Sequence, residues 1–475
     1  MSAATAVERG KFLTGSTMRH VIVMTLTASA GLVSVFFIDA LNLFYISLLG
    51  QQALAAAVGY ATTILFFSFS IGIGMSISAS ALVSRAIGAG ETERSRKMAT
   101  TALIYLAVAM VVFSTLLFFT RHATLAMIGA QGEALEMAAR FMAIVIPSIP
   151  LVGFGMCFGA LLRSKGDAKR AMYVTLSGAA AAMVLDPLLI FGFDMGLDGA
   201  AYATVLSRLV IVAVGLHGVH KVHNMLGRPD AEDFIGHLRP FMGIALPALT
   251  TQMATPVGNA YVTGAIAEFG DDAVAGWAIV GRLIPVAFGV IFALSGAVGP
   301  ILGQNYGAKD YPRVLQSMKD AFVFTLVFCL SVWLLLALGK DGIIWLFGAS
   351  GEAADIISIF CLWGAGTFVF AGALFVANAA FNNLGKPLLA TAYNWGRATL
   401  GTIPFVYFGM AWGAEGVIIG WSLGAVVFGG LGVLSAYRLV KNLPETDGGG
   451  PIDPPTHLPP SANSPFTTAK GATTG

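Results

Sequence analysis

Acidic residues within long apolar stretches are the first candidates for chemistry in this sequence. Asp39 and Asp186 each lie in such a stretch, and Pro187 follows the second directly. A carboxyl group in a low-dielectric, partly hydrated site takes up a proton near neutral pH, because burial disfavours its charged form. Two carboxylates also bind Na⁺ together with hydroxyl and carbonyl oxygens, since hard cations prefer oxygen ligands. Both interpretations make these residues a cation-coupling site. The structural alternative is that they accept hydrogen bonds from neighbouring helices.

Three arginines, Arg208, Arg282 and Arg397, lie in further apolar stretches. Arginine keeps its charge in a protein, so each must face a cavity, water, an acid or backbone carbonyls. Bonds to carbonyls would hold helices together, whereas a cavity position would present positive charge to an anionic or zwitterionic substrate. The other polar and aromatic candidates for the wall of a substrate cavity are Tyr60, Gln252, Asn259, Trp277, Asn378, Asn382 and Asn394.

Membrane-spanning helices are the elements expected to position these residues. Of the 475 residues, 56% are hydrophobic and 11% are charged, whereas soluble proteins carry about 25% charged residues. A helix crosses the bilayer with about 20 mostly apolar residues. Twelve stretches meet this length: 20–48, 54–83, 98–119, 136–162, 170–191, 198–219, 240–268, 273–303, 319–339, 355–383, 388–408 and 414–437. The sequence therefore predicts an all-α integral membrane protein with 12 transmembrane helices.

Several function classes are excluded by the same sequence. The net charge of +2, with no long basic run, leaves no electrostatic footprint for nucleic acid. There is no phosphate-binding loop, and no stretch carries a Ser/His pair or a metal-ligand cluster, so neither an enzyme nor a bound metal or cofactor is expected. The three cysteines lie in apolar stretches and are interpreted as buried thiols: Cys157, Cys329 and Cys361. Three histidines form a row in a polar stretch and are interpreted as part of a solvated linker: His217, His220 and His223.

An internal repeat divides the chain into two halves. Residues 84–91 (SRAIGAGE) align with 303–310 (GQNYGAKD) at an offset of 219, and Leu49-Gly50 with Phe269-Gly270 at 220. Six helices thus recur in the same order and orientation, which predicts two lobes with a cleft between them. The expected segments are a cytoplasmic N-terminal segment 1–19, lobes 20–219 and 240–440, a cytoplasmic linker 220–239 and a disordered tail 441–475.

Four motifs together carry a family resemblance. They are ALVSRAIGAGETERSRK (81–97), GPILGQNYGAKDYPRVLQ (299–316), LDPLLIFG (185–192) and NAAFNNLGKP (378–387). In combination they resemble the multidrug and toxic compound extrusion (MATE) family over about residues 15–440. The resemblance implies an exporter driven by a proton or sodium gradient, with its cavity between the two lobes.

The resemblance also implies roles for particular residues. Asp186 matches the acid that family members carry on helix 5, although Ala182 stands where an Asn is usual. The usual helix 1 acid falls on Asn42, and Asp39 lies three residues earlier, so Asn42 is expected to partner a displaced acid. A second acidic site of the family, on helices 7 and 10, is absent at Thr255 and Ala371.

The expected function is a secondary active antiporter that exports small organic molecules or drugs in exchange for H⁺ or Na⁺ by alternating access of two lobes. The alternative is a flippase for a lipid-linked precursor, which an arginine-lined cavity would suit. Lys and Arg concentrate in loops that place both termini in the cytoplasm. A monomer in the bacterial inner membrane is expected, whose partners are its substrate and the lipid bilayer.

Overall fold

The computed structural model describes residues 10–47 and 52–446, excluding some side chains near the end of the first helix and the start of the second. Within these residues every regular element is a helix. The α-helices are α1 (Thr17–Ser47), α2 (Gln52–Gly88), α3 (Thr92–Met127), α4 (Gly132–Val145), α5 (Ile149–Lys165), α6 (Ala168–Pro187), α7 (Gly196–Leu216), α8 (Ala231–Ala267), α9 (Asp271–Gly307), α10 (Tyr311–Phe347), α11 (Gly351–Ile359), α12 (Ala365–Asn383), α13 (Pro387–Ala398), α14 (Ile403–Gly409), α15 (Gly413–Lys441) and α16 (Leu443–Thr446). The short elements are the 3₁₀-helices η1 (Lys11–Leu13), η2 (Ile146–Ser148) and η6 (Met410–Trp412), and the π-helices η3 (Leu188–Gly192), η4 (His217–Val222) and η5 (Phe360–Gly364).

The expected twelve membrane passes are confirmed in the described residues. Ten segments are long and apolar enough to cross a membrane, and the longest of them, Pro387–Lys441, contains two passes separated by the turn at Gly413. The remaining pass is α8, in which three prolines and polar residues such as Gln252 and Asn259 lower the hydropathy. The all-α fold class is therefore confirmed.

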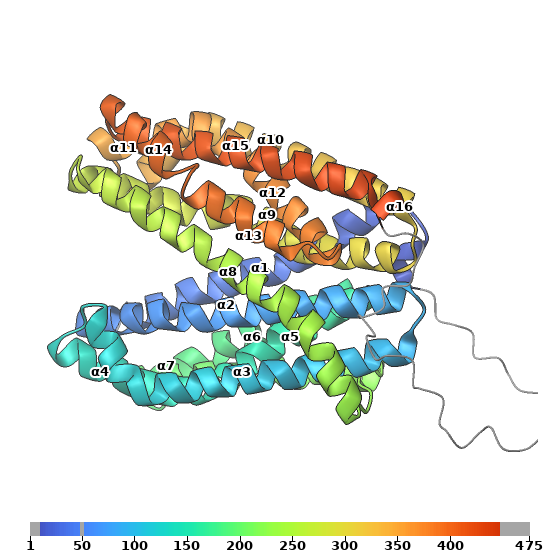
Figure 1. Ribbon diagram of the computed structural model, residues 1–475. Helices are drawn as coiled ribbons and strands as arrows, with labels where there is room; N and C mark the ends of the chain where they lie inside the picture. The colour runs from blue at the N-terminus through green and yellow to red at the C-terminus, as the bar shows by residue number, and fades with distance from the viewer. Residues whose placement is uncertain (1–9, 48–51, 447–475) are drawn as a thin grey trace, which may run out of the picture.

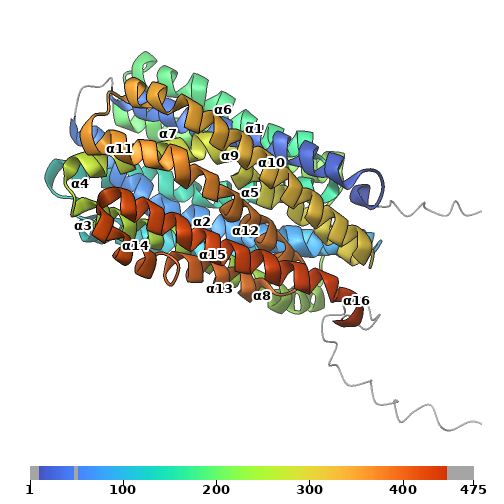
Figure 2. The same cartoon turned by 90° about the horizontal axis from the view of Figure 1, so that it is seen from above.

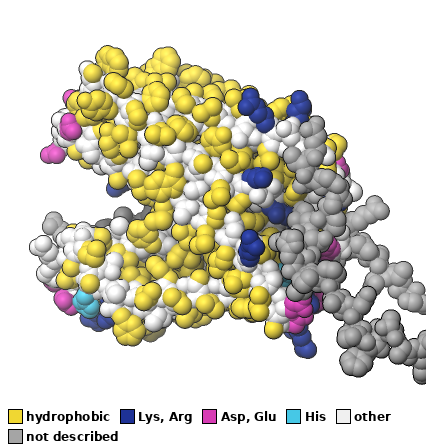
Figure 3. Space-filling view, in the orientation of Figure 1, with side chains coloured by type: hydrophobic (Ala, Val, Ile, Leu, Met, Phe, Trp, Pro, Cys, Tyr) yellow, Lys and Arg dark blue, Asp and Glu magenta, His cyan; other side chains and the backbone are white. Residues whose placement is uncertain are grey.

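The helices form two lobes (Figures 1 and 2). The N-lobe contains α1–α7 and the C-lobe contains α8–α15, and each lobe has its own apolar core. Between the lobes, α1 and α2 pack against α9, and α2 also packs against α8. The lobes touch at the end where the described chain begins and ends, here called the closed end. They diverge toward the other end, the open end, where a space-filling view shows a hollow between them (Figure 3).

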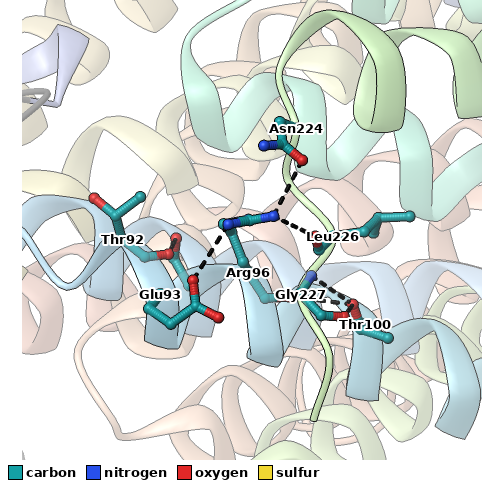
Figure 4. Close-up of polar contacts among 8 residues, drawn as sticks. Thr92, Glu93, Arg96, Thr100, Asn224, Leu226 and Gly227 are labelled. Atoms are coloured by element: carbon teal, nitrogen blue, oxygen red, sulfur yellow. Dashed lines mark hydrogen bonds and ion pairs between the residues drawn. The ribbon is translucent and has the colours of Figure 1, made fainter.

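Helix α8 packs on both lobes. Its residues Phe241, Ile244 and Ala245 belong to the N-lobe core, whereas its later turns contribute to the C-lobe core. Residues 223–230 lead into α8 along α3. In this segment the Arg96 guanidinium donates to Asn224 Oδ1 (3.1 Å) and Leu226 O (3.0 Å), as Figure 4 shows. The stretch 220–239, expected as a linker, thus comprises the end of η4, a segment bound to α3 and the first turns of α8.

The start of α1 packs on the C-lobe in a corresponding way. The Thr17 hydroxyl donates to the Asp320 carboxylate of α10, and the Thr101 hydroxyl of α3 bonds His237 Nδ1 of α8 at 3.2 Å. Thr17 and His237 are 220 residues apart, and Thr101 and Asp320 are 219 apart, so the two contacts are equivalent under the internal repeat. Each half therefore begins its first helix against the opposite lobe.

Candidate functional site in the cleft between the lobes

The closed end is sealed where the two copies of the repeated motif meet. The guanidinium of Arg85, on α2, donates to the backbone oxygens of Asn383 (2.7 Å) and Asn382 (2.9 Å) at the end of α12. These carbonyls belong to the last turn of a helix, where they have no intrahelical partner and a positive charge is favourable. The same guanidinium lies 5.6 Å from the centre of the Tyr306 ring. Arg85 of the N-lobe therefore caps a helix of the C-lobe.

Glycines allow this contact to close completely. A Cβ atom on Gly88 would lie 1.9 Å from the backbone oxygen of Gln304, and one on Gly307 would lie 2.0 Å from that of Arg85. The Gln304 side chain then bridges three segments, because it accepts from the Phe12 N–H (2.9 Å) and donates to Ser164 O (2.6 Å). We call these contacts between residues 84–88, 303–307 and 382–383 the seal.

The predicted cation-coupling residues lie along α1 and α6, which pack side by side. Gly31 contacts Thr175, and the Tyr45 ring meets the Phe191 ring at 6.2 Å between centroids. This register brings the backbone of residues 39 and 42 level with about residues 184 and 187. Asp186 is 1% exposed. The side chains of Asp39 and Asn42 lie outside the described part of the structure.

Asp186 also marks a change in helix type. It is followed by Pro187, which has no N–H to donate, and then by the π-helix η3. Such π-helical turns within α-helices occur often at functional sites. A buried carboxyl therefore stands where the regular backbone pattern ends.

Arg208 faces the interior of the N-lobe and is 8% exposed. Its guanidinium donates to Ser148 Oγ (2.6 Å) and Val145 O (3.3 Å), where α4 gives way to η2. These bonds hold α7 to the break between α4 and α5. The structure therefore places Arg208 inside a lobe and not on the cleft wall.

Arg282 lies on the face of α9 that turns toward the N-lobe. Gly303, Gly296 and Gly289 repeat at seven-residue intervals on this face, against Ser84, Arg163 and Val33 respectively. Seven residues are nearly two full helical turns, so Arg282, seven residues before Gly289, continues the same face toward the open end. Arg282 is exposed and forms no hydrogen bond or ion pair with a described residue.

Arg397 reaches the same region from α13. Its Nη2 donates to Thr255 Oγ1 of α8 (2.9 Å), and its own carbonyl accepts from the Thr402 hydroxyl (2.8 Å) where α13 breaks. Broken helices at membrane depth typically line cavities or binding sites. Gln252 and Asn259 lie seven residues apart on one face of α8, and the same face contacts Gly74 of α2 lower down, at Ala245 and Leu249.

Other predicted cavity residues pack within a lobe. Trp277 is 8% exposed, meets the Trp421 ring edge to face, and donates to Thr263 Oγ1 (3.0 Å). Asn394 donates to Asn378 Oδ1 (2.9 Å), and both are buried. Two residues lie at other positions: Asn382 is in the seal, and Tyr60 donates to Gly129 O (3.4 Å) at the open end.

Within residues 10–47 and 52–446 there is no group of three His, Cys, Asp or Glu side chains that would hold a metal ion. His223 Nε2 instead lies 2.8 Å from Asp167 Oδ2, at the closed end. Burial raises the pKa of this carboxyl, but hydrogen bonds from Arg170 and from His223 outweigh burial and lower the pKa to about 2.

Comparisons with known proteins agree with this architecture. The MatE family model matches residues 25–188 and 247–408. The FAD transporter of Shewanella oneidensis is 25% identical over 92% of this chain and 97% of its own length. The multidrug export protein MepA of Staphylococcus aureus is 27% identical over 60% of this chain and 65% of its own length. The Vibrio cholerae MATE transporter VcmN in its bent form superposes with a TM-score of 0.86 at 23% identity, covering 90% of this chain and 98% of VcmN. The resemblance noted in the motifs is thereby confirmed, and the chain belongs to the MATE family of multi-pass membrane transporters.

Proposed function

We propose that the protein is a secondary active exporter that works by alternating access. The observation that carries this proposal is the two-lobed cleft, open at one end and closed at the other by direct contact of the two repeated motifs. Reversing which end is sealed would move a bound solute across the membrane without a continuous channel. The open state is the one that releases substrate and accepts the coupling ion.

The proposed coupling ion is H⁺ or Na⁺, taken up at Asp186. A buried carboxyl at membrane depth is costly when charged, so binding a cation stabilises it and favours repacking of α1 against α6. We propose Asp39 and Asn42 of α1 as its partners, because the register of the two helices brings their backbone to this level. This differential affinity for the ion in the two states is what couples the gradient to transport.

We propose that the closed end faces the cytoplasm. Lys and Arg side chains gather toward this end of the molecule (Figure 3), and basic residues favour the cytoplasmic side of a membrane. The cargo is proposed to be a small organic molecule. The names of relatives cover both multidrug export and FAD transport, so the charge of the cargo has to be argued from the cleft itself.

Gradient-driven uptake into inverted membrane vesicles tests the coupling proposal. One cationic and one anionic dye are followed under an imposed pH or sodium gradient, for the wild type and for Asp186→Asn. We expect uptake of at least one dye by the wild type and its loss in the variant, which stays folded. Asp272→Asn removes a carboxylate from an exposed position at the open end and should leave uptake unchanged. Full uptake by Asp186→Asn would remove Asp186 from the mechanism.

A further inference from the structure

Arg163 lies at the floor of the cleft, on the last turn of α5. The next residue is Ser164, whose backbone oxygen accepts a hydrogen bond from the Gln304 side chain in the seal. Its guanidinium extends back along α5 toward the open end, with Nη1 3.3 Å from the position that a Cβ atom on Gly159 would take. Across the lobe interface, Nε and Nη2 lie 3.8 and 3.9 Å from the corresponding position on Gly296 of α9. The guanidinium therefore stands between the two lobes.

This orientation is unusual for an arginine near the end of a membrane helix. Such side chains normally extend toward the nearest interface, where water and head groups solvate the charge. The Nε of Arg163 is buried without a hydrogen-bond partner, and no hydrogen bond or ion pair among the described residues involves this side chain. A charge held in this way costs free energy unless an opposite charge joins it. Gly296, which faces it, is exposed and leaves space for a ligand.

Two further arginines stand nearer the open end. The hydrogen bond from Trp277 to Thr263 fixes the antiparallel register of α9 and α8. In this register Arg282 is level with about residue 258 of α8. That level is within one turn of Thr255, whose hydroxyl accepts from Arg397. Along α9, Gly296 is 14 residues deeper than Arg282, which corresponds to about 21 Å. Positive charge is thus present both along the cleft wall and at its floor.

We infer that the cleft binds organic anions, with a phosphate or carboxylate group held by Arg163 at the floor and guided there by Arg282 and Arg397. The inference rests on the proposed transporter function and adds the class of substrate. A guanidinium suits this role because its planar donors match both oxyanions in a bidentate manner. Asp186, deeply buried in the N-lobe, is left to serve the coupling ion. Substrate and ion thereby occupy separate sites of opposite charge.

Equilibrium binding to the purified full-length chain tests this inference without requiring a gradient. The probes are FAD (phosphate), fluorescein (carboxylate), riboflavin (no net charge) and ethidium (cation). We expect an anion to bind, and Arg163→Gln to weaken its affinity about 10- to 100-fold, as loss of a charge-assisted hydrogen bond predicts. Arg163→Lys should lose less, since it keeps the charge. Arg19→Gln removes an exposed arginine at the closed end and should leave the affinity unchanged.

Preference for FAD over fluorescein would identify phosphate as the recognised group, and the reverse would identify carboxylate. Equal anion affinity in the wild type and Arg163→Gln would overturn the inference, as would tighter binding of ethidium or riboflavin, or no binding of either anion. Arg163→Gln should unfold at the same or a higher temperature, because it removes an uncompensated charge. A lower unfolding temperature with unchanged affinity would show a purely structural role. Binding is measured without a gradient, so its result does not depend on ion-coupled uptake. A failure of the proposed transport function and a failure of this inference can therefore be told apart.

Discussion

Replacing Arg85 with Gln should release the seal at the closed end. Arg85 donates across the lobe interface to two backbone oxygens, at 2.7 and 2.9 Å, and it lies against the Tyr306 ring. Glutamine has one amide in place of the planar guanidinium and carries no charge, so it cannot cap the end of α12 in the same way.

The expected size of the effect follows from these contacts. A hydrogen bond to a charged group contributes about 1.5–3 kcal/mol, and half-burial reduces the sum. Losing two such bonds should therefore weaken the sealed state by about 2–4 kcal/mol. This corresponds to a shift of about 30- to 900-fold in the equilibrium between sealed and unsealed states. Such a shift makes a minor unsealed population directly observable.

Distance measurement between spin labels provides the assay. Lys169 of the N-lobe and Lys386 of the C-lobe are exposed at the closed end and can each be replaced by a labelled cysteine. The three native cysteines are buried and should not react. We expect one short distance in the wild type and an added longer population in Arg85→Gln. Arg94→Gln is the matched control, because Arg94 pairs with Glu91 (2.7 Å) within the N-lobe. A wild-type distance distribution in Arg85→Gln, or an equal shift in Arg94→Gln, would refute this role for Arg85.

Two further predictions concern stability. The pKa of Asp167 is lowered to about 2, so its ionised form stabilises the fold above its ordinary pKa, and this contribution disappears as the pH falls from about 4 to about 2. Asp167→Asn should therefore unfold at a lower temperature than the wild type at neutral pH, and thermal unfolding in detergent should show the gap closing toward pH 2. A gap that stays constant with pH would contradict this assignment. Trp277→Ala should destabilise the protein by about 3–5 kcal/mol, because the indole packs in the C-lobe core. The anion affinity of Trp277→Ala, measured as for the Arg163 variants, should equal that of the wild type. A lower affinity together with unchanged stability would show that Trp277 lines the cleft and does not serve the core.

Much of the fold follows from apolar length and internal repetition. Long apolar stretches predict membrane passes because an unpaired backbone is too costly in lipid, and a repeat in the same orientation predicts paired lobes. The repeated motifs were visible in the sequence, yet their direct contact was not. That contact depends on how the lobes turn toward each other, which the 219-residue offset does not encode.

The candidate site was harder to predict because residue type and depth do not give side-chain direction. Arg208 and Arg282 are equally deep in apolar stretches, but packing turns the first toward Ser148 inside a lobe and the second toward the cleft. Arg163 falls one residue beyond the apolar stretch 136–162, so the sequence places it in a loop and not in the cleft. Gly159, one turn earlier, was the available signal, since it leaves room for a long side chain to fold back along the helix.

The reciprocal start of α1 and α8 on opposite lobes has a topological consequence. Each apolar core contains residues lent by the other half, with Phe12 and Val21 in the C-lobe core and Phe241 and Ile244 in the N-lobe core. A single six-helix half would therefore leave its own apolar core incomplete. The first helix of each half thus ties the two lobes together, and separating them would expose apolar surface in both cores.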